Sequence, residues 1–208
     1  MAGNHLTLHT NDRVVVTTSR GNQEKWFDAE KNLWYKVDDG CFEALAEAVS
    51  SEILRNFTNV TRLPGITVAN YWVDTAEVHG LKRVVSVSEN FKREEESLVT
   101  ANTILKNSLG TGYLEVFNRR TSLKERIRLL ADAMEEATGM QDMGAYLTTL
   151  FEIDALFLNQ DRHLNNIALI RDRAGYKPCP IFDCGDSFLL DFALYSPEIE
   201  SRAYLTKA

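Results

Sequence analysis

The feature that most constrains this chain is an acid, an amide and a second acid that stand in order in its second half. Asp161 precedes Asn166 by five positions, the apolar run 167–170 follows, and Asp183 comes later between an apolar pair and a glycine turn. Transfer of a phosphoryl group uses this order of parts, because one carboxylate must receive the proton of a hydroxyl while separate oxygen atoms hold Mg²⁺. The spacing therefore predicts Asp161 as the catalytic carboxylate, and Asn166 and Asp183 as the metal ligands.

Neighbouring residues compete for these roles. Asn165 lies one position short of the required separation, and Asp186 lacks the apolar residues and the turn that surround Asp183. We interpret His163 as a residue that braces its loop by hydrogen bonding, in preference to a general base. Arg162 has two interpretations that the sequence leaves open: it braces the loop, or it offsets the charge of the substrate phosphate.

A lysine and a glutamate upstream fit the same chemistry. Lys36 lies on an expected strand, 33–37, and Glu47 lies on an expected amphipathic helix from about Phe42 to Asn56. A strand lysine is usually solvated, so this one gains its interpretation from the downstream acids: an ion pair between such a lysine and a helix glutamate positions nucleotide phosphates. We therefore predict that Lys36 and Glu47 are catalytic. The buried stripe of the helix is expected to contain Phe42, Leu45, Ala46, Val49 and Ile53.

The polar segment 19–25 interrupts the apolar pattern between the β-branched run 14–18 and the aromatic pair Trp26–Phe27. This pattern predicts a loop between two strands, in which Gly21 lets backbone N–H groups approach a phosphate closely. A plain hairpin turn is the alternative. Further along the chain, two more strands are expected on either side of a turn at His79–Gly80.

The balance of expected elements changes near residue 91. Strands dominate before it and helices after it, where Ser122–Glu125 forms a capping box at the start of a helix. We therefore expect an α+β protein with the two-lobed fold of a protein kinase: a small β-rich lobe with one helix at 1–91 and a helical lobe at 92–208. The buried face of the capped helix is expected to contain Leu123, Ile127, Leu130, Ala131 and Met134.

Such a fold places a hinge after the last strand of its small lobe, and the backbone of the hinge faces the adenine of ATP. Glu89 to Phe91 is the segment that this arrangement predicts as the hinge. An ordinary strand end is the alternative interpretation of the same residues.

Composition and charge exclude several classes of function. The net charge of -7 comes with no basic stripe, so direct nucleic-acid binding is not expected. The chain has no run of eighteen apolar residues and its first residues lack a secretion signal, so we expect no membrane span. Its three cysteines, without a C-x-x-C spacing, fit reduced thiols in a cytoplasmic protein.

Together these segments resemble the HipA-like serine/threonine protein kinases, in order and in approximate spacing, from about Val14 to Asp191. The most specific piece of the resemblance is the pattern Asp-x-His-x-x-Asn, supported by the pattern Gly-x-Gln-x-Lys. The segments that carry it are 21–25, 34–36, 45–47, 161–166 and 181–183.

The resemblance implies ATP and Mg²⁺ as cofactors and a protein serine or threonine hydroxyl as substrate. It also implies that Thr18 or Ser19 is autophosphorylated. Members of the family are often bacterial toxins or stress regulators, sometimes held by a DNA-binding antitoxin, so an antitoxin or another regulatory protein is the implied partner. The residues assigned to nucleotide binding are Thr18, Ser19, Gly21, Asn22, Gln23, Lys25, Lys36, Glu89 and Phe91.

The chain ends soon after Asp183, earlier than a helical lobe normally needs to complete its core. We therefore expect either a piece of a longer protein or a truncated lobe that another chain completes. Two alternative functions stay open. One is a phosphatidylinositol-type or small-molecule kinase, whose loops share the Asp-x-x-x-x-Asn spacing, and the other is a nucleotide-binding regulator without transfer activity.

Overall fold

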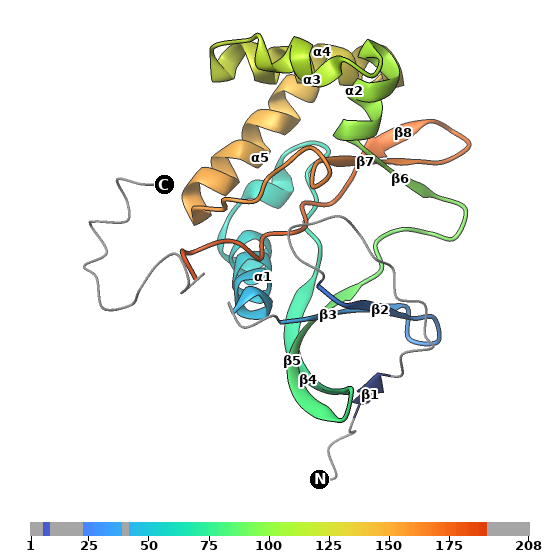
Figure 1. The fold of residues 1–208 in the computed structure, drawn as a ribbon, viewed down its shortest axis with the longest axis vertical. Coiled ribbons are helices and arrows are strands. Elements are labelled where there is room, and N and C mark those ends of the chain that lie inside the picture. The colour runs from blue at the N-terminus through green and yellow to red at the C-terminus, as the bar shows by residue number, and fades with distance from the viewer. Residues whose placement is uncertain (1–5, 9–22, 39–41, 191–208) are drawn as a thin grey trace, which may run out of the picture.

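The structure of the protein is a computed structural model that describes residues 6–8, 23–38 and 42–190 (Figure 1). Within these ranges, no helix is long and apolar enough to cross a lipid bilayer. The expected strand 14–18 lies outside the described residues, and so do four of the residues assigned to nucleotide binding, Thr18, Ser19, Gly21 and Asn22.

Within the described residues, five strands form the first sheet: β1 (Leu6–Leu8), β2 (Lys25–Asp28), β3 (Leu33–Val37), β4 (Tyr71–Val78) and β5 (Leu81–Glu89). Their order along the sheet is β1-β4-β5-β3-β2, and every neighbouring pair is antiparallel except β1 and β4, which are parallel. The expected turn at His79–Gly80 is confirmed. Both of its residues have positive φ, as a type I′ hairpin turn requires.

Alternation along the strands separates the two faces of this sheet. Trp26, Tyr35 and Val87 are cross-strand neighbours, and all three are buried in the apolar core on one face. Lys25 and Lys36 are cross-strand partners one register position away, so they lie on the opposite face. The strand pattern alone therefore directs two lysines to one side of the sheet.

Helix α1 (Glu43–Glu52) packs against β4 and β5 on the face that carries the lysines, and it continues into a π-helical turn, Ile53–Phe57. The expected buried stripe is wrong for Phe42, Leu45 and Val49, which are exposed, whereas Ala46 is buried as expected. Small side chains on the opposite side let the helix lie close to its neighbours, and the one acid among them has a cationic partner, so its burial is tolerated. The inward face contains Ala44, Ala46, Glu47, Ser50 and Ser51.

The later part of the described chain contains β6 (Ser97–Thr100), α2 (Ala101–Leu109), α3 (Tyr113–Asn118), α4 (Leu123–Thr138), α5 (Met143–Phe157), β7 (Ala168–Arg171) and β8 (Tyr176–Pro178). The three strands form a second, antiparallel sheet in the order β6-β7-β8. The capping box at Ser122–Glu125 is confirmed. Leu130, Ala131 and Met134 are buried as expected, whereas Leu123 is exposed because the packed part of α4 begins one turn later, at Ile127.

A short backbone bridge joins the two parts of the molecule. Val68 pairs in parallel with Ile181: Ala69 N–H donates to the Ile181 carbonyl at 2.9 Å, and Ile181 N–H donates to the Thr67 carbonyl at 2.8 Å. Ile181 is buried in the larger apolar core, so its position is well determined by packing. The bridge delivers the chain to Asp183, two residues further on, beside α1.

Candidate active site

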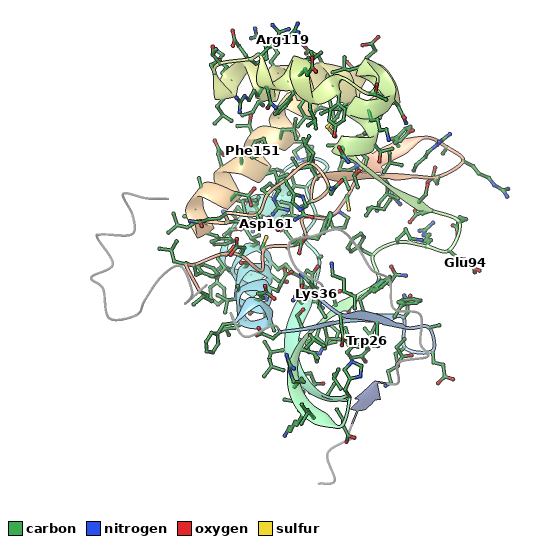
Figure 2. All side chains as sticks on the ribbon, in the orientation of Figure 1. Trp26, Lys36, Glu94, Arg119, Phe151 and Asp161 are labelled. Carbon is green, nitrogen blue, oxygen red and sulfur yellow. The ribbon has the colours of Figure 1, made fainter. Side chains whose placement is uncertain are left out.

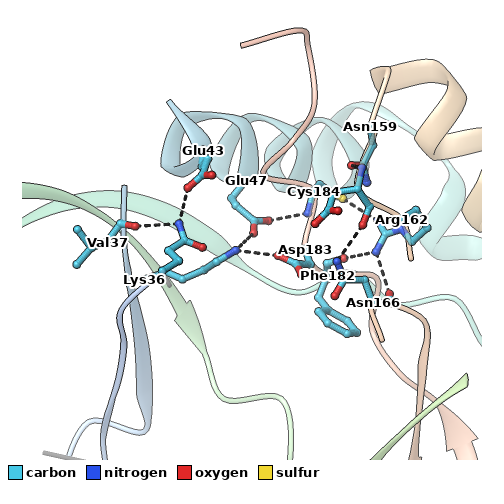
Figure 3. A network of polar contacts seen from close by, with 12 residues as sticks. Lys36, Val37, Glu43, Glu47, Asn159, Arg162, Asn166, Phe182, Asp183 and Cys184 are labelled. Carbon is cyan, nitrogen blue, oxygen red and sulfur yellow. Dashed lines mark hydrogen bonds and ion pairs between the residues drawn. The ribbon is translucent and has the colours of Figure 1, made fainter. Parts of the chain in front are cut away.

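Three charged side chains from three separate segments meet between the first sheet and the helical part (Figure 3). Lys36 Nζ on β3 donates to Glu47 Oε1 on α1 at 3.1 Å and to Asp183 Oδ1 at 2.7 Å. The Glu47 side chain is 1% exposed, and those of Lys36 and Asp183 are 15% and 16% exposed. Lys36 is therefore a largely buried ion-pair residue, and the interpretation of it as a solvated lysine is wrong.

The electrostatics of this cluster favour a charged lysine beside an ionised aspartate. Burial lowers the pKa of Lys36, but the carboxylates of Asp183 and Glu47 outweigh it and raise that pKa well above its usual value. Burial raises the pKa of Asp183, but Lys36 and Lys25 outweigh it and hold that pKa well below its usual value. For Glu47, burial outweighs the attraction of Lys36 and raises the pKa. Asp183 is thus the acid that stays ionised, which its predicted role as a metal ligand requires.

The backbone after Ile181 fixes the acid against α1. Asp183 has a φ of 60°, a left-handed conformation that aspartate and asparagine adopt more readily than most residues. Cys184 N–H donates to Glu47 Oε2 at 3.0 Å. At Gly185, a Cβ atom would lie 3.5 Å from Glu43 Cβ, so this residue is in contact with the first turn of α1. The segment 183–185 and α1 therefore hold each other in place.

Asp161 and Asn166 lie on one loop between α5 and β7, and Figure 2 shows Asp161 near the junction of the sheet and the helices. Asn166 Nδ2 donates to the Asp161 carbonyl at 3.0 Å, and the Asp161 side chain is 22% exposed. His163 Nε2 is 3.9 Å from Asp161 Oδ2, but neither ring nitrogen has a hydrogen-bond partner among the described residues. The expectation that the His163 ring braces the loop by hydrogen bonding was therefore wrong.

Arg162 braces the loop instead. Its side chain is 4% exposed, and its guanidinium donates to both carboxylate oxygens of Asp154 on α5, with Nε to Oδ2 at 2.9 Å. Its Nη1 donates to the backbone carbonyls of Phe182, at 2.7 Å, and Asn166, at 3.0 Å (Figure 3). A guanidinium enclosed by these acceptors is a structural brace. The alternative, a cation directed at the substrate phosphate, is wrong.

Gln23 and Lys25 are the residues assigned to nucleotide binding in the predicted phosphate loop that the structure describes. Gln23 Nε2 donates to the Val37 carbonyl at 2.8 Å and to the Glu43 carboxylate, so the end of the loop is attached to the first turn of α1. Lys25 lies beside Lys36 on the same face of the sheet. Burial and the neighbouring charge of Lys36 both lower the pKa of Lys25. The structure therefore brings a second cation next to the Lys36 ion pair.

The predicted hinge residues have different surroundings. Glu89 ends β5, and its carboxylate accepts a hydrogen bond from Asn70 Nδ2 at 3.3 Å. Asn90 N–H donates to the Asn32 carbonyl at 3.0 Å, so this backbone donor is already engaged. Phe91 packs against Phe182, with ring centroids 5.8 Å apart. Of these residues, Phe91 is the one that lies against the segment carrying Asp183.

The donor atoms fit Mg²⁺. Asn166 and Asp183 offer amide and carboxylate oxygens, which hard cations prefer. The amide nitrogen of Asn166 is bonded to the Asp161 carbonyl, which leaves the oxygen as the atom for a cation. The described residues contain no group of three or more His, Cys, Asp or Glu that could hold a metal ion on its own. Two protein oxygens are enough where phosphate oxygens and water complete the coordination, as is usual for Mg²⁺.

Our sequence reasoning missed Asp154. Its side chain is 7% exposed, and it lies on the face of α5 that also buries Leu147 and Leu150. An acid at a buried position of an apolar helix requires a partner, because an unpaired buried charge is very unfavourable. The position of Asp154 within the apolar stripe of an expected helix is the sequence signal that could have revealed this buried ion pair.

The structure has a mixed α+β, kinase-like fold in which a small, largely antiparallel sheet precedes the helices. The structure is similar to the crystal structure of the Helicobacter pylori proinflammatory kinase CtkA, with a TM-score of 0.60 and 20% sequence identity. The match covers 91% of this chain and 59% of that one, so this chain spans less than two thirds of its neighbour's length. No family model matches the sequence, and no curated protein matches it.

Proposed function

We propose that this protein transfers the γ-phosphoryl group of ATP to a protein serine or threonine hydroxyl, as HipA-like kinases do. The observation that carries the proposal is the position of Lys36 between Glu47 and Asp183. A lysine held by a helix glutamate, next to an acid that binds the metal, is the arrangement that positions nucleotide phosphates in kinases. The loop with Asp161 and Asn166, which contacts the same acidic segment through Arg162, supports it.

The residues then have distinct tasks in the transfer. Asp161 receives the proton of the acceptor hydroxyl while the hydroxyl oxygen forms a bond to the γ-phosphorus. The bond between that phosphorus and its bridging oxygen breaks, and the electron pair leaves on the β-phosphate of ADP. Lys36 and Lys25 offset the negative charge of the phosphates. Asn166 and Asp183 would hold Mg²⁺, which would supply further charge neutralisation at the phosphate oxygens.

The test is incubation of the purified protein with labelled ATP and Mg²⁺, followed by a mass-spectrometric map of phosphosites. We expect label on serine or threonine, either in this chain or in an added protein substrate, and far less label with Asp161→Asn. Label on a phosphoinositide or a small hydroxyl compound instead would support the small-molecule kinase alternative. Binding of Mg-ATP without any transfer would identify a nucleotide-binding regulator.

Mg-ATP should also raise the melting temperature of the protein. A ligand that binds only the folded state at roughly one hundred times its Kd stabilises by about 2.7 kcal/mol. For a chain of this size we expect a shift of roughly 5 to 10 °C. Differential scanning fluorimetry with ATP and Mg²⁺ measures it, and ATP with a chelator is the matched control, for which the shift should be much smaller. An unchanged melting temperature at millimolar Mg-ATP contradicts nucleotide binding.

A further inference from the structure

One buried arginine contacts both the loop that carries Asp161 and Asn166 and the segment that carries Asp183. Arg162 follows Asp161 directly in the chain, and its Nη1 donates to the backbone carbonyl of Asn166. The same nitrogen donates to the carbonyl of Phe182, and Nη2 lies 3.4 Å from Cys184 Sγ, so the guanidinium touches both neighbours of Asp183. A single side chain therefore connects the loop of the predicted base to the segment of the predicted metal ligand (Figure 3).

Asp154 holds this arginine from the helix behind it. Its carboxylate accepts from Nε and Nη2 of Arg162 at 2.9 to 3.2 Å. The same carboxylate accepts from Asn159 Nδ2 at 2.7 Å, and Asn159 Oδ1 in turn accepts from Asp161 N–H at 3.2 Å. Asp154 thus orients two connections, one through Arg162 to the flanks of Asp183 and one through Asn159 to the backbone of Asp161.

We propose that Arg162 and Asp154 are a positioning pair that fixes the separation between Asp161 and Asp183. The inference rests on the proposed phosphoryl transfer, and it assigns to the pair no contact with nucleotide or acceptor. In such a reaction, the acid that takes the proton and the acid that holds the metal must keep one geometry relative to each other, because a misplacement of about 1 Å can reduce the rate a hundredfold.

The chemistry of arginine suits this role better than that of lysine. A guanidinium has five donors in a rigid plane, so it can bond a carboxylate with one edge and two backbone carbonyls with the other. A lysine ammonium carries the same charge on a single nitrogen and cannot reach all three segments at once. The charge-conserving variant Arg162→Lys therefore separates the geometry of the brace from its charge.

For Arg162→Lys we expect kcat for phosphoryl transfer to fall by about a hundredfold, while the KM for ATP changes by less than about threefold. The Mg²⁺ concentration at half-maximal rate should rise at the same time. Each rate is divided by the concentration of folded protein, which is determined from the fraction of the sample that unfolds in a cooperative thermal transition. A brace that serves stability alone would lower the melting temperature and leave the rate per folded molecule unchanged. The matched control is Arg171→Lys, which alters an exposed arginine stacked on Tyr176 in the β7–β8 hairpin.

If Arg162→Lys does not fold, the double variant Arg162→Met with Asp154→Leu tests the proposed positioning pair instead. Replacing a buried ion pair by apolar residues of similar size often preserves folding, yet here it removes the bridge to the Phe182 carbonyl. We expect the double variant to fold and to show the same loss of kcat. Transfer within threefold of wild type in either folded variant overturns the positioning pair. A wild-type protein that transfers no phosphate contradicts the proposed function itself, which is a separate result.

Discussion

Asp161→Asn should remove most of the phosphoryl transfer and leave Mg-ATP binding almost unchanged. General base catalysis typically contributes about a thousandfold, and the amide cannot accept the proton, so kcat should fall by about that factor. The loop should keep its shape, because the contacts from Asn166 Nδ2 and His163 N–H are made to the Asp161 backbone carbonyl, which the substitution retains. Labelled phosphate transfer measures the rate, and calorimetric titration with ATP and Mg²⁺ measures the affinity.

Asp183→Asn is the comparison that tests the assignment of the two acids. Asparagine adopts the left-handed backbone of this position as readily as aspartate does, so the segment should keep its conformation. The anionic metal ligand is lost, and we expect ATP affinity to weaken mainly when Mg²⁺ is present, together with kcat. If Asp161→Asn abolishes ATP binding while Asp183→Asn keeps binding and transfer, the two roles are assigned incorrectly. Asp186→Asn is a third variant in this comparison. If its ATP binding loses the dependence on Mg²⁺, Asp186 is the metal ligand instead of Asp183.

Lys36→Ala should damage both phosphoryl transfer and the stability of the fold. The substitution leaves Glu47 and Asp183 facing each other without their shared cation. Removing one partner of a buried ion pair typically costs about 3 to 5 kcal/mol, and we expect the lower end because Lys36 and Asp183 keep some exposure. Loss of the phosphate contact should reduce kcat/KM for ATP by at least about a hundredfold. Thermal melting and transfer assays on the same preparation measure the two effects.

A second substitution separates the effect of Lys36 on stability from its effect on phosphoryl transfer. Adding Glu47→Gln to Lys36→Ala removes one of the uncompensated charges while its side-chain oxygen can still accept the Cys184 N–H. We expect the double variant to recover melting temperature but not transfer. Lys31→Ala is the matched control, since Lys31 forms an exposed ion pair with Asp28 at 3.3 Å, and such pairs contribute at most about 1 kcal/mol. Recovery of transfer in the double variant would show that Lys36 acts only through stability.

The local elements of this protein could be predicted from its sequence. The apolar and aromatic residues at Trp26–Phe27 and at 33–37 predicted β2 and β3, the residue pair His79–Gly80 predicted a turn, and the capping box predicted the start of α4. The spacing of Asp161 and Asn166 identified a loop in which the two residues contact each other. These features depend on residues close together in the chain, where propensity, turn chemistry and periodicity act directly.

Which side chains face one another could not be predicted from the sequence and follows from the packing of the folded chain. Periodicity predicted that α1 buries Phe42, Leu45 and Val49, but the helix turns this face outward, because Glu47 pairs with Lys36 on the other side. Lys36 and Asp183, which are 147 residues apart, form an ion pair because the bridge at Ile181 brings the segment 183–185 against α1. The packing of the folded chain also distinguishes between the interpretations of Arg162 and His163.

Arg162 is a brace because its partners, Asp154 and the Phe182 carbonyl, surround it, and the His163 ring is not a brace because no hydrogen-bond partner among the described residues reaches it. A sequence pattern records how apolar or polar each position is. It does not record the partner of a buried charge, because that partner lies on a segment that comes close only when the chain has folded.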